Sequence, residues 1–220
     1  MEGVEPAAVA SLEREWWLHT LRVLRRPRPV FQGLRDDSDE AASARQEPLA
    51  AIVFLGGIAA VLATGTAGRL LDDPLYDGLL IALWAIVAGA IYGIASYLLA
   101  GVAVYLGQRA AGGTGTYRQA RHLLGFSAVP LLAWLILVWP VRLALYGEDL
   151  FRTGGSDGPA SRAVFDAIGG LFVAWCLALL VVGLRTVYRW DWRRTAIALS
   201  LAVAAFVALA FAAAVLLRGA

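Results

Sequence analysis

The sequence is poor in the side chains from which most metal and disulfide sites are built. It has one cysteine, two histidines and no lysine, because all 19 basic residues are arginine. Cys176 cannot form an intrachain disulfide, and it lies in an apolar run where a small buried hydrophobe is the usual role. His19 and His122 lie on different segments, and neither is spaced from an acid as in a helical zinc site. We therefore expect no metal site.

The patterns that mark other chemistries are missing as well. No Gly-x-Ser-x-Gly elbow occurs, and Gly-Gly-Thr-Gly-Thr at 112–116 lacks the Lys-Ser/Thr ending of a phosphate loop. The long apolar runs have no charge at their centres, since Asp166 and Arg142 fall near run ends, where each can reach water. This absence argues against a proton-coupled transporter or an ion pump. We expect no catalytic residue, no cofactor and no enzymatic activity.

Hydrophobic residues dominate the chain instead. They make up 60% of it, only 16% is charged, and the mean hydropathy is +0.66. A soluble domain is closer to half apolar and about a quarter charged, so lipid must solvate much of this chain. Five apolar runs are long enough to cross a bilayer, at about 49–67, 79–106, 123–145, 164–184 and 196–217. The predicted fold is an all-α integral membrane protein with a five-helix transmembrane domain over 48–220.

An N-terminal segment, residues 1–47, precedes the first run. Residues 7–25 have the period of an amphipathic helix lying in the membrane interface, and Pro27 and Pro29 should end it. The apolar side of this helix comprises Val9, Leu12, Trp16, Thr20, Val23 and Leu24, extended by Trp17 and Leu21. The opposite side carries Arg14, Glu15, Arg22 and Arg25. The acidic run after Arg35 reads as a solvated linker up to Glu47.

The distribution of arginine between the loops predicts the orientation. Fourteen of the 19 arginines fall in the N-terminal segment, in the loop 108–122 and in the loop 185–195. The remaining five are spread over the other side and mixed with acids such as Asp72, Asp157 and Glu148. Short cytoplasmic loops are enriched in arginine, so we predict a cell (inner) membrane protein with a cytoplasmic N-terminus and its C-terminus outside.

Two groups of residues predict features of helix packing. Gly89 and Gly93 form a GxxxG pair that allows two helices to approach closely, either within the chain, along a ligand path or at a homo-oligomer face. Pro130 cannot donate to the carbonyl of Phe126, so the third span should kink there. Gly125 leaves room beside this kink, and Ser127 can bond to the nearby backbone.

The cytoplasmic face is basic and aromatic around the start of the third span. Tyr117 and Arg118 are expected at headgroup level, where aromatic rings and cations are favoured. The candidate contacts with anionic lipid headgroups or with a cytoplasmic or membrane protein are Tyr117, Arg118, Arg121, Arg22, Arg25 and Arg26. Nothing in the sequence points to nucleic acid.

The same region carries a family resemblance. The glycine-rich loop is followed by Tyr-Arg-x-Ala at 117–120 and by Gly-Phe-Ser-x-x-Pro at 125–130. With the five-span layout and a preceding Pro27-x-x-x-Phe31 segment, this stretch resembles the Yip domain family, the Ypt/Rab-interacting membrane proteins, in its bacterial form. The Asp-Leu-Tyr-Gly-Pro signature of eukaryotic members is absent, so Rab binding is not carried over.

Two functions remain open at this point. The resemblance implies a non-enzymatic scaffold or adaptor in membrane organisation or trafficking-like processes, which contacts lipid or a partner through its cytoplasmic basic face. The glycine pair of the second span and the kink of the third are compatible with a small oligomeric transporter, channel or lipid-moving protein.

Overall fold

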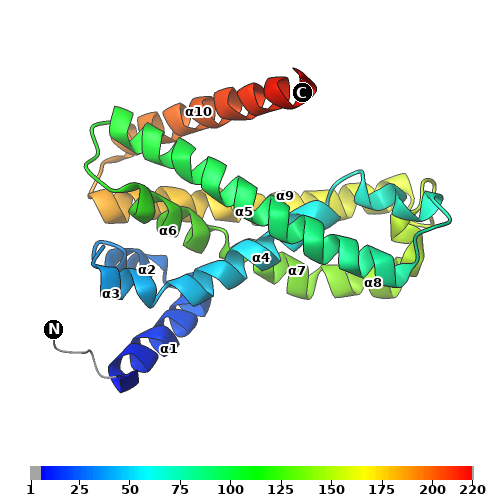
Figure 1. Ribbon diagram of the computed structural model, residues 1–220, viewed down its shortest axis with the longest axis horizontal. Coiled ribbons are helices and arrows are strands. Elements are labelled where there is room, and N and C mark those ends of the chain that lie inside the picture. Colours follow the sequence, from blue (N-terminus) through cyan, green and yellow to red (C-terminus); the bar gives the residue numbers. More distant parts are fainter. Residues whose placement is uncertain (1–5, 220) are drawn as a thin grey trace. The chain divides into compact units, whose positions relative to one another are not determined.

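The computed structural model describes residues 6–219, and every regular element in that range is a helix (Figure 1). The amino-terminal part holds α1 (Pro6–Arg22), α2 (Pro27–Gly33), α3 (Asp39–Ser43) and α4 (Gln46–Leu62). The middle holds η1 (Ala67–Asp72), α5 (Gly78–Ala110), α6 (Tyr117–Ser127), α7 (Val129–Leu137) and α8 (Trp139–Tyr146). The last elements are η2 (Gly147–Phe151), α9 (Pro159–Tyr188) and α10 (Trp192–Gly219).

Five helical stretches are long and apolar enough to cross a membrane, which confirms the predicted number of spans. They are Asp39–Leu62, Gly78–Ala110, Tyr117–Phe151, Pro159–Tyr188 and Trp192–Ala212. Most of the residues in the most apolar part of each stretch are not buried by the protein, and in the last only 17% are. Lipid contact is therefore needed to shield this apolar surface.

Contacts divide the described chain into two compact units. Unit 1 contains residues 6–50, 95–127 and 178–219, and unit 2 contains residues 51–94 and 128–177. Unit 1 therefore carries most of the arginines, the N-terminal segment and the glycine-rich loop. Unit 2 carries the turn after α4, both 3-10 helices and the beginning of α9.

Prolines break the third span into shorter helices. Pro130 stands in the first turn of α7 and Pro140 in the first turn of α8. N–H groups in the first turn have no acceptor within the helix, so a proline there removes no hydrogen bond. The predicted break at Pro130 is thus confirmed. In unit 1, Ser127 Oγ donates to the carbonyl oxygen of Leu123 at 2.7 Å, at the end of α6.

The N-terminal segment is more folded than its sequence indicated. Helix α1 ends at Arg22, and Pro27 begins α2, so the proline starts a helix where we had expected only an end. The expected solvated linker contains α3, which Ser38 caps by accepting from the N–H of Ala41 at 3.3 Å. Only Met1–Glu5 and Ala220, together with the side chains of residues 6–13, 213 and 216–219, lie outside the described structure, so the predicted apolar positions Val9 and Leu12 fall there.

Within unit 1, α1 packs against the protein through part of its apolar side. Trp16, Thr20 and Val23 are buried. The ring of Trp16 lies 5.2 Å from that of Phe126, centroid to centroid. Trp17 and Leu21 of the same predicted side are exposed. The helix is amphipathic, but its apolar side is shared between the protein and the surroundings.

Small residues allow close helix contacts in both units. In unit 2, a Cβ at Gly57 of α4 would lie 2.1 Å from the carbonyl oxygen of Gly89 and 2.8 Å from Cα of Gly93. The GxxxG pair is therefore used within the chain, against α4. In unit 1, a Cβ at Gly107 of α5 would lie 2.4 Å from the carbonyl oxygen of Ala198, so α10 approaches α5 equally closely there.

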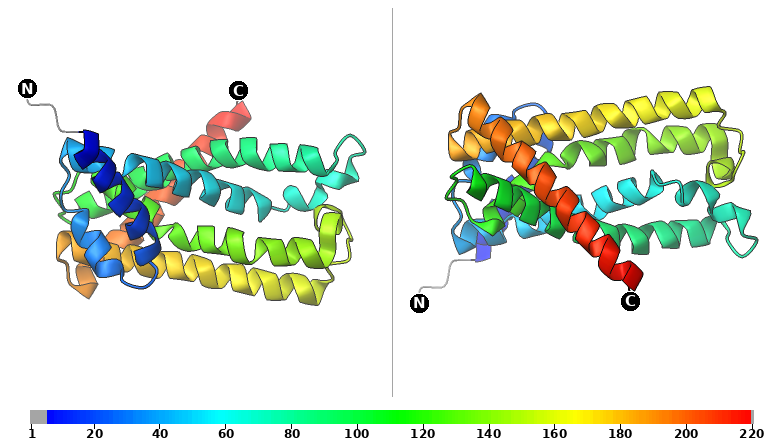
Figure 2. Two further views of the ribbon diagram at one scale, coloured as in Figure 1. Left: turned by 90° about the horizontal axis from the view of Figure 1, so that it is seen from below. Right: turned by 90° about the horizontal axis from the view of Figure 1, so that it is seen from above.

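The core of unit 2 gathers around two tryptophans. Trp134 and Trp139 have their ring centroids 6.1 Å apart and pack with Leu70, Leu71, Leu150 and Phe151 of the two 3-10 helices. Both views in Figure 2 show α7 and α8 running beside the first half of α9. Asp72 accepts from the N–H of Thr153 at 2.8 Å and from its hydroxyl, which ties the two turns together.

Candidate functional site

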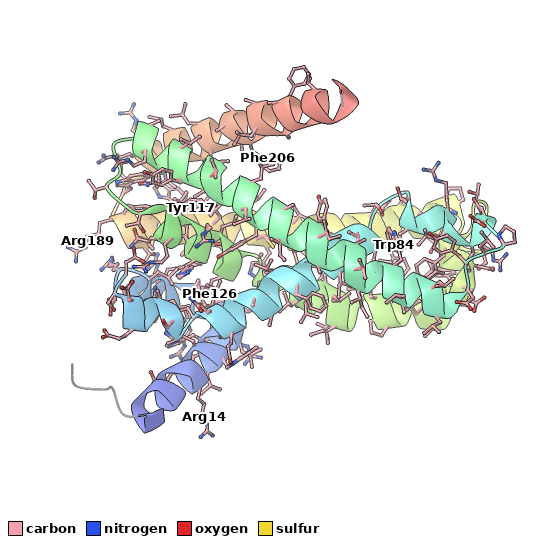
Figure 3. All side chains as sticks on the ribbon, viewed as in Figure 1. Arg14, Trp84, Tyr117, Phe126, Arg189 and Phe206 are labelled. Atoms are coloured by element: carbon pink, nitrogen blue, oxygen red, sulfur yellow. The ribbon has the colours of Figure 1, made fainter. Side chains whose placement is uncertain are left out.

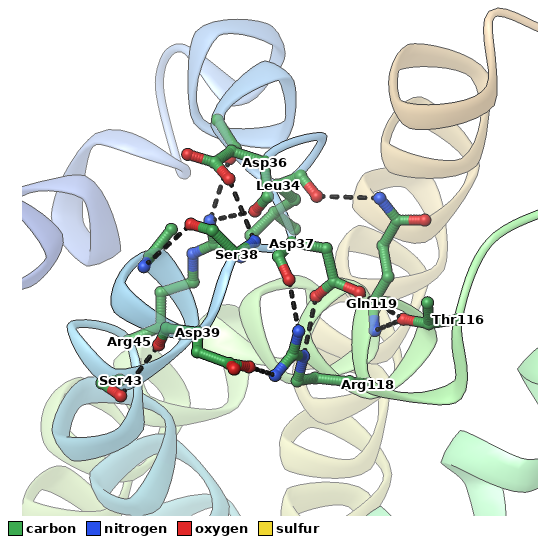
Figure 4. A network of polar contacts seen from close by, with 12 residues as sticks. Leu34, Asp36, Asp37, Ser38, Asp39, Ser43, Arg45, Thr116, Arg118 and Gln119 are labelled. Carbon is green, nitrogen blue, oxygen red and sulfur yellow. Dashed lines mark hydrogen bonds and ion pairs between the residues drawn. The ribbon is translucent and has the colours of Figure 1, made fainter. Parts of the chain in front are cut away.

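The predicted contact residues all belong to unit 1, but they form three separate groups. The first group holds the acidic run against α6 (Figure 4). Arg118 Nε lies 2.9 Å from Asp37 Oδ1, and its Nη1 lies 2.6 Å from Asp39 Oδ1. The same guanidinium also donates to the carbonyl oxygen of Asp37. Arg118 is thus paired with carboxylates of its own unit, and its expected contact with lipid or a partner stays a prediction.

Arg45 is a buried cation beside this group that the sequence did not single out. Its side chain is 1% exposed and donates to the carbonyl oxygens of Gly33, at 3.1 Å, and Asp36, at 2.5 Å. Its guanidinium also lies 4.7 Å from the centroid of Trp16, a favourable position for a cation over an indole face. Arg45 therefore joins α1 to the turn that follows α2, which is a structural role.

Tyr117 and Arg121 form the second group, together with Tyr97 of α5. The Arg121 guanidinium lies 4.9 Å from the ring centroid of Tyr117 and 5.7 Å from that of Tyr97. Tyr117 donates its hydroxyl to the carbonyl oxygen of Leu98 at 3.1 Å. Gly101 makes room for the arginine, because a Cβ there would lie 2.6 Å from Arg121 Cγ. These two candidates hold α6 against α5 and are only partly exposed.

The glycine-rich loop before α6 is closed by polar side chains from its own unit. Gln108, which is fully buried, donates to the carbonyl oxygen of Gly115 at 2.9 Å. Arg194 donates to the carbonyl oxygens of Ala111 and Gly112, at 2.8 and 2.7 Å. Gly112 has φ +79°, a conformation that strongly favours glycine. The loop is a fixed connection, and its pattern of glycines reflects backbone geometry.

Arg22, Arg25 and Arg26 form the third group, and it differs from the other two. They are exposed and line a cavity of about 760 Å³ together with His19, Leu21, Leu24, Pro29 and Val30. Among the side chains that the structure describes, none of these arginines has an acidic partner within 4.0 Å. We call this surface the α1–α2 basic pocket. It combines unneutralised cations with apolar walls.

His19 adds a titratable group to the α1–α2 basic pocket. Burial holds the pKa of its imidazole below the ordinary value of 6.5, and the positive charge of Arg22 lowers it further, whereas Glu15 opposes the shift. The imidazole ring packs edge-on against Trp16, with 5.0 Å between centroids. At neutral pH His19 is therefore uncharged, and the charge of the pocket comes from its arginines.

Figure 3 shows two further arginines of unit 1 whose side chains point outward. Arg14 lies on α1 and Arg189 in the turn between α9 and α10, and both are exposed. Arg35 is exposed as well, but it donates to the carbonyl oxygen of Thr186 and so fixes the end of α9. The basic surface thus consists of anchoring arginines and of unpaired ones, and the α1–α2 basic pocket belongs to the second kind.

The described residues were also compared for clustered metal ligands. In the described part of the chain, no group of three or more histidine, cysteine and acidic residues is placed to hold a metal ion. The residues that the sequence reading missed are Arg45, Gln108, Gln119 and Arg194. No local pattern marks them, because their partners are backbone carbonyls, and those of Gln119 and Arg194 lie 82 to 85 residues away along the chain. Gln119, for example, donates to the carbonyl oxygen of Leu34 at 2.9 Å.

Most of the chain matches a known protein family. The family described as the Yip1 domain matches residues 21–215, which is most of the chain. No curated protein matches, and no solved structure does.

Proposed function

This chain belongs to the Yip1 domain family of membrane proteins, and from that premise we propose that it is a non-enzymatic scaffold or adaptor. Its α1–α2 basic pocket holds anionic lipid headgroups and so presents the N-terminal segment to a membrane-associated partner. The carrying observation is that Arg22, at the end of α1, and Arg25 and Arg26, in the turn before α2, share one cavity without an acidic partner. Trp16 and Val23 of the same segment are buried.

The energetics of this arrangement favour a lipid surface. An arginine close to an anionic bilayer contributes about 1 kcal/mol, so three of them contribute roughly 3 kcal/mol if their effects add. The exposed Trp17, Leu18 and Leu21 add apolar area on the same helix. Because α1 is already packed against the protein, the ordering cost of placing these side chains at the membrane is low.

The proposal includes an orientation. The arginine-rich N-terminal segment and loops face the cytoplasm of a bacterial cell, with the N-terminus inside and the C-terminus outside the inner membrane. The support is the arginine bias of the loops, together with an odd number of candidate spans. Fusions of a periplasm-active phosphatase after Asp73, Arg109 and Gly219 test it. Activity is expected after Asp73 and Gly219 only, and a fusion active after Arg109 would contradict the orientation.

The transport alternative has lost part of its support. The glycine pair of the second span packs against α4 within unit 2, which supports a role in contact within the chain. Trp134 of α7 and Trp139 of α8, the two helices that follow the breaks of the third span, pack in the core of unit 2. We therefore propose the scaffold role alone.

The adaptor role is tested by co-purification from native membranes. The full chain and its Arg22→Gln/Arg25→Gln/Arg26→Gln variant are extracted with the same mild detergent, and the co-eluting proteins and lipids are quantified. We expect anionic lipid and at least one protein to be depleted in the variant. The matched control is Arg109→Gln/Arg189→Gln/Arg193→Gln, which removes three exposed arginines outside the pocket. Equal recovery from all three proteins would contradict the proposal.

A further inference from the structure

A second basic cavity lies in unit 2, far along the chain from the α1–α2 basic pocket. It has a volume of about 400 Å³ and is enclosed by the turn after α4, by η1, by α7 and α8, and by the segment from Leu150 to Asp166. We call it the unit 2 cavity. Nothing in the proposed function uses it.

Every arginine of unit 2 lines the unit 2 cavity. Unit 2 has only four, namely Arg69, Arg142, Arg152 and Arg162. Of the acids of this unit, only Asp157 and Asp166 line the cavity, so two positive charges remain in excess. Four separate loops and helices contribute these arginines, and their convergence on one space of this size points to a negatively charged occupant.

The buried part of the cavity has too few acceptors for its donors. Asp157 is 5% exposed; its Oδ1 lies 2.7 Å from Arg162 Nη2, and its Oδ2 lies 3.9 Å from Arg142 Nη2. One carboxylate is thus shared by two guanidiniums. Arg142 is held in place by aromatic rings, with its guanidinium 5.0 Å from the centroid of Trp139 and 5.1 Å from that of Phe165.

Three of the residues that line this cavity each have a buried polar atom without a partner, and all three atoms are donors. They are the Nε of Arg142 and the indole nitrogens of Trp134 and Trp139, each buried and without an acceptor. A buried donor without a hydrogen-bond acceptor destabilises the protein. Two indole N–H groups and a guanidinium cannot bond to one another, because all of them are donors. The missing element at this site is therefore an acceptor.

From these observations we propose that the unit 2 cavity binds a phosphate group, either free or as the headgroup of an anionic phospholipid. A phosphate offers several acceptor oxygens in different directions, which suits guanidiniums that converge from separate elements. A single carboxylate would leave more of the donors unpaired. The apolar wall formed by Leu62, Trp134 and Leu150 allows the headgroup of a lipid as well as a free ion.

The test uses the purified full chain and two probes. Inorganic phosphate is titrated against the protein in detergent by calorimetry and thermal shift. Phosphatidylglycerol is compared with phosphatidylcholine in nanodiscs by the same thermal shift. We expect at least one probe to stabilise the protein, whereas acetate, as a carboxylate control, should not. A response to phosphate identifies a free-ion site, and a response to phosphatidylglycerol alone identifies a headgroup site.

The residue-level test is Arg69→Gln/Arg152→Gln. Both side chains are exposed and neither is in an ion pair, so this variant should fold as the parent does. We expect its affinity for the effective probe to fall by at least about tenfold, because two charge-assisted contacts are lost. Arg109→Gln/Arg193→Gln, which removes two exposed arginines of unit 1, should bind both probes as the parent does. The triple variant of the α1–α2 basic pocket should keep the response that Arg69→Gln/Arg152→Gln loses, although it binds less phosphatidylglycerol in total.

The outcomes separate this site from the proposed function. Binding that survives in the triple variant and weakens in Arg69→Gln/Arg152→Gln supports the unit 2 cavity whatever becomes of the adaptor role. The inference is overturned if neither probe stabilises the parent, if acetate stabilises it equally, or if Arg109→Gln/Arg193→Gln weakens binding as much as Arg69→Gln/Arg152→Gln does.

Discussion

At the scale of single residues, the arginines of unit 1 fall into two kinds that hydropathy and charge counts do not separate. Arg118, Arg121 and Arg45 are held by carboxylates, aromatic rings or backbone carbonyls within the unit. Arg22 and Arg25 have no such partner and line a cavity. Only unpaired arginines can neutralise an external anion without first breaking an internal contact.

The two carboxylates that contact Arg118 should differ in importance. The side chain of Asp39 is 95% exposed, whereas that of Asp37 is 17% exposed and also accepts from Thr116. We therefore expect Asp37→Asn to loosen the segment after α2 and Asp39→Asn to leave it nearly unchanged. Limited proteolysis of the purified chain between Arg35 and Arg45 measures this. Faster cleavage of Asp39→Asn than of Asp37→Asn would contradict the assignment.

The imidazole of His19 makes the packing of α1 sensitive to acid. Its folded pKa is depressed, so the unfolded chain binds the proton more tightly. The contribution of His19 to stability is complete above the ordinary pKa of about 6.5 and is lost as the pH falls towards the depressed value. Thermal unfolding of the parent and of His19→Gln at several pH values should show their difference shrinking on acidification. A difference that grows instead would contradict this sign.

At the scale of elements, close packing of glycines replaces the polar contacts that soluble helices use. Gly57 and Gly56 are neighbours on α4, yet a Cβ at Gly57 would lie 2.1 Å from the carbonyl oxygen of Gly89, and one at Gly56 would meet nothing within 4 Å. The two positions therefore form a matched pair for testing whether α4 and α5 pack as described.

Alanine at Gly57 should push α4 and α5 apart. We expect Gly57→Ala to lower the free energy of unfolding by about 1–3 kcal/mol, as overpacking of a tight contact does. Gly56→Ala should leave the free energy of unfolding unchanged or raise it slightly, because alanine is the better helix former and the space is open. Thermal denaturation in one detergent measures both. Equal destabilisation of the two variants would show that glycine is needed for a reason other than this contact.

The elements themselves were predictable to different degrees from the sequence. Each span is a long apolar run of its own, so hydropathy suffices to find it, and Pro130 breaks the third span for a reason that is local to the chain. The fold of residues 27–45 was not predictable in this way. It depends on Arg45 and on the pairing of Asp37 with Arg118, which lie 81 residues apart, and no local pattern encodes such a contact.

At the scale of the whole molecule, the candidate site was only partly predictable. The sequence indicated a basic face and named Arg22, Arg25 and Arg26, and the structure places these three in one cavity. It equally named Tyr117 and Arg118, whose side chains serve packing and ion pairs inside unit 1. Charge density in a sequence shows where cations are, whereas their internal partners decide which of them remain available.

The two basic cavities lie in different units and invite different roles. The α1–α2 basic pocket is lined by unpaired exposed arginines and serves the proposed contact with a membrane surface. The unit 2 cavity is smaller, and its buried donors lack an acceptor. Since their arginines do not overlap, each site can be removed without touching the other.

Retention of anionic lipid tests the central claim most directly. The full chain and its Arg22→Gln/Arg25→Gln/Arg26→Gln variant are equilibrated with equal amounts of phosphatidylglycerol and phosphatidylcholine, and bound lipid is counted by native mass spectrometry at low and high salt. We expect the parent to prefer phosphatidylglycerol, a preference that salt weakens. The variant should lose most of it, whereas Arg109→Gln/Arg189→Gln/Arg193→Gln should keep it. An unchanged preference in the α1–α2 variant would contradict the account.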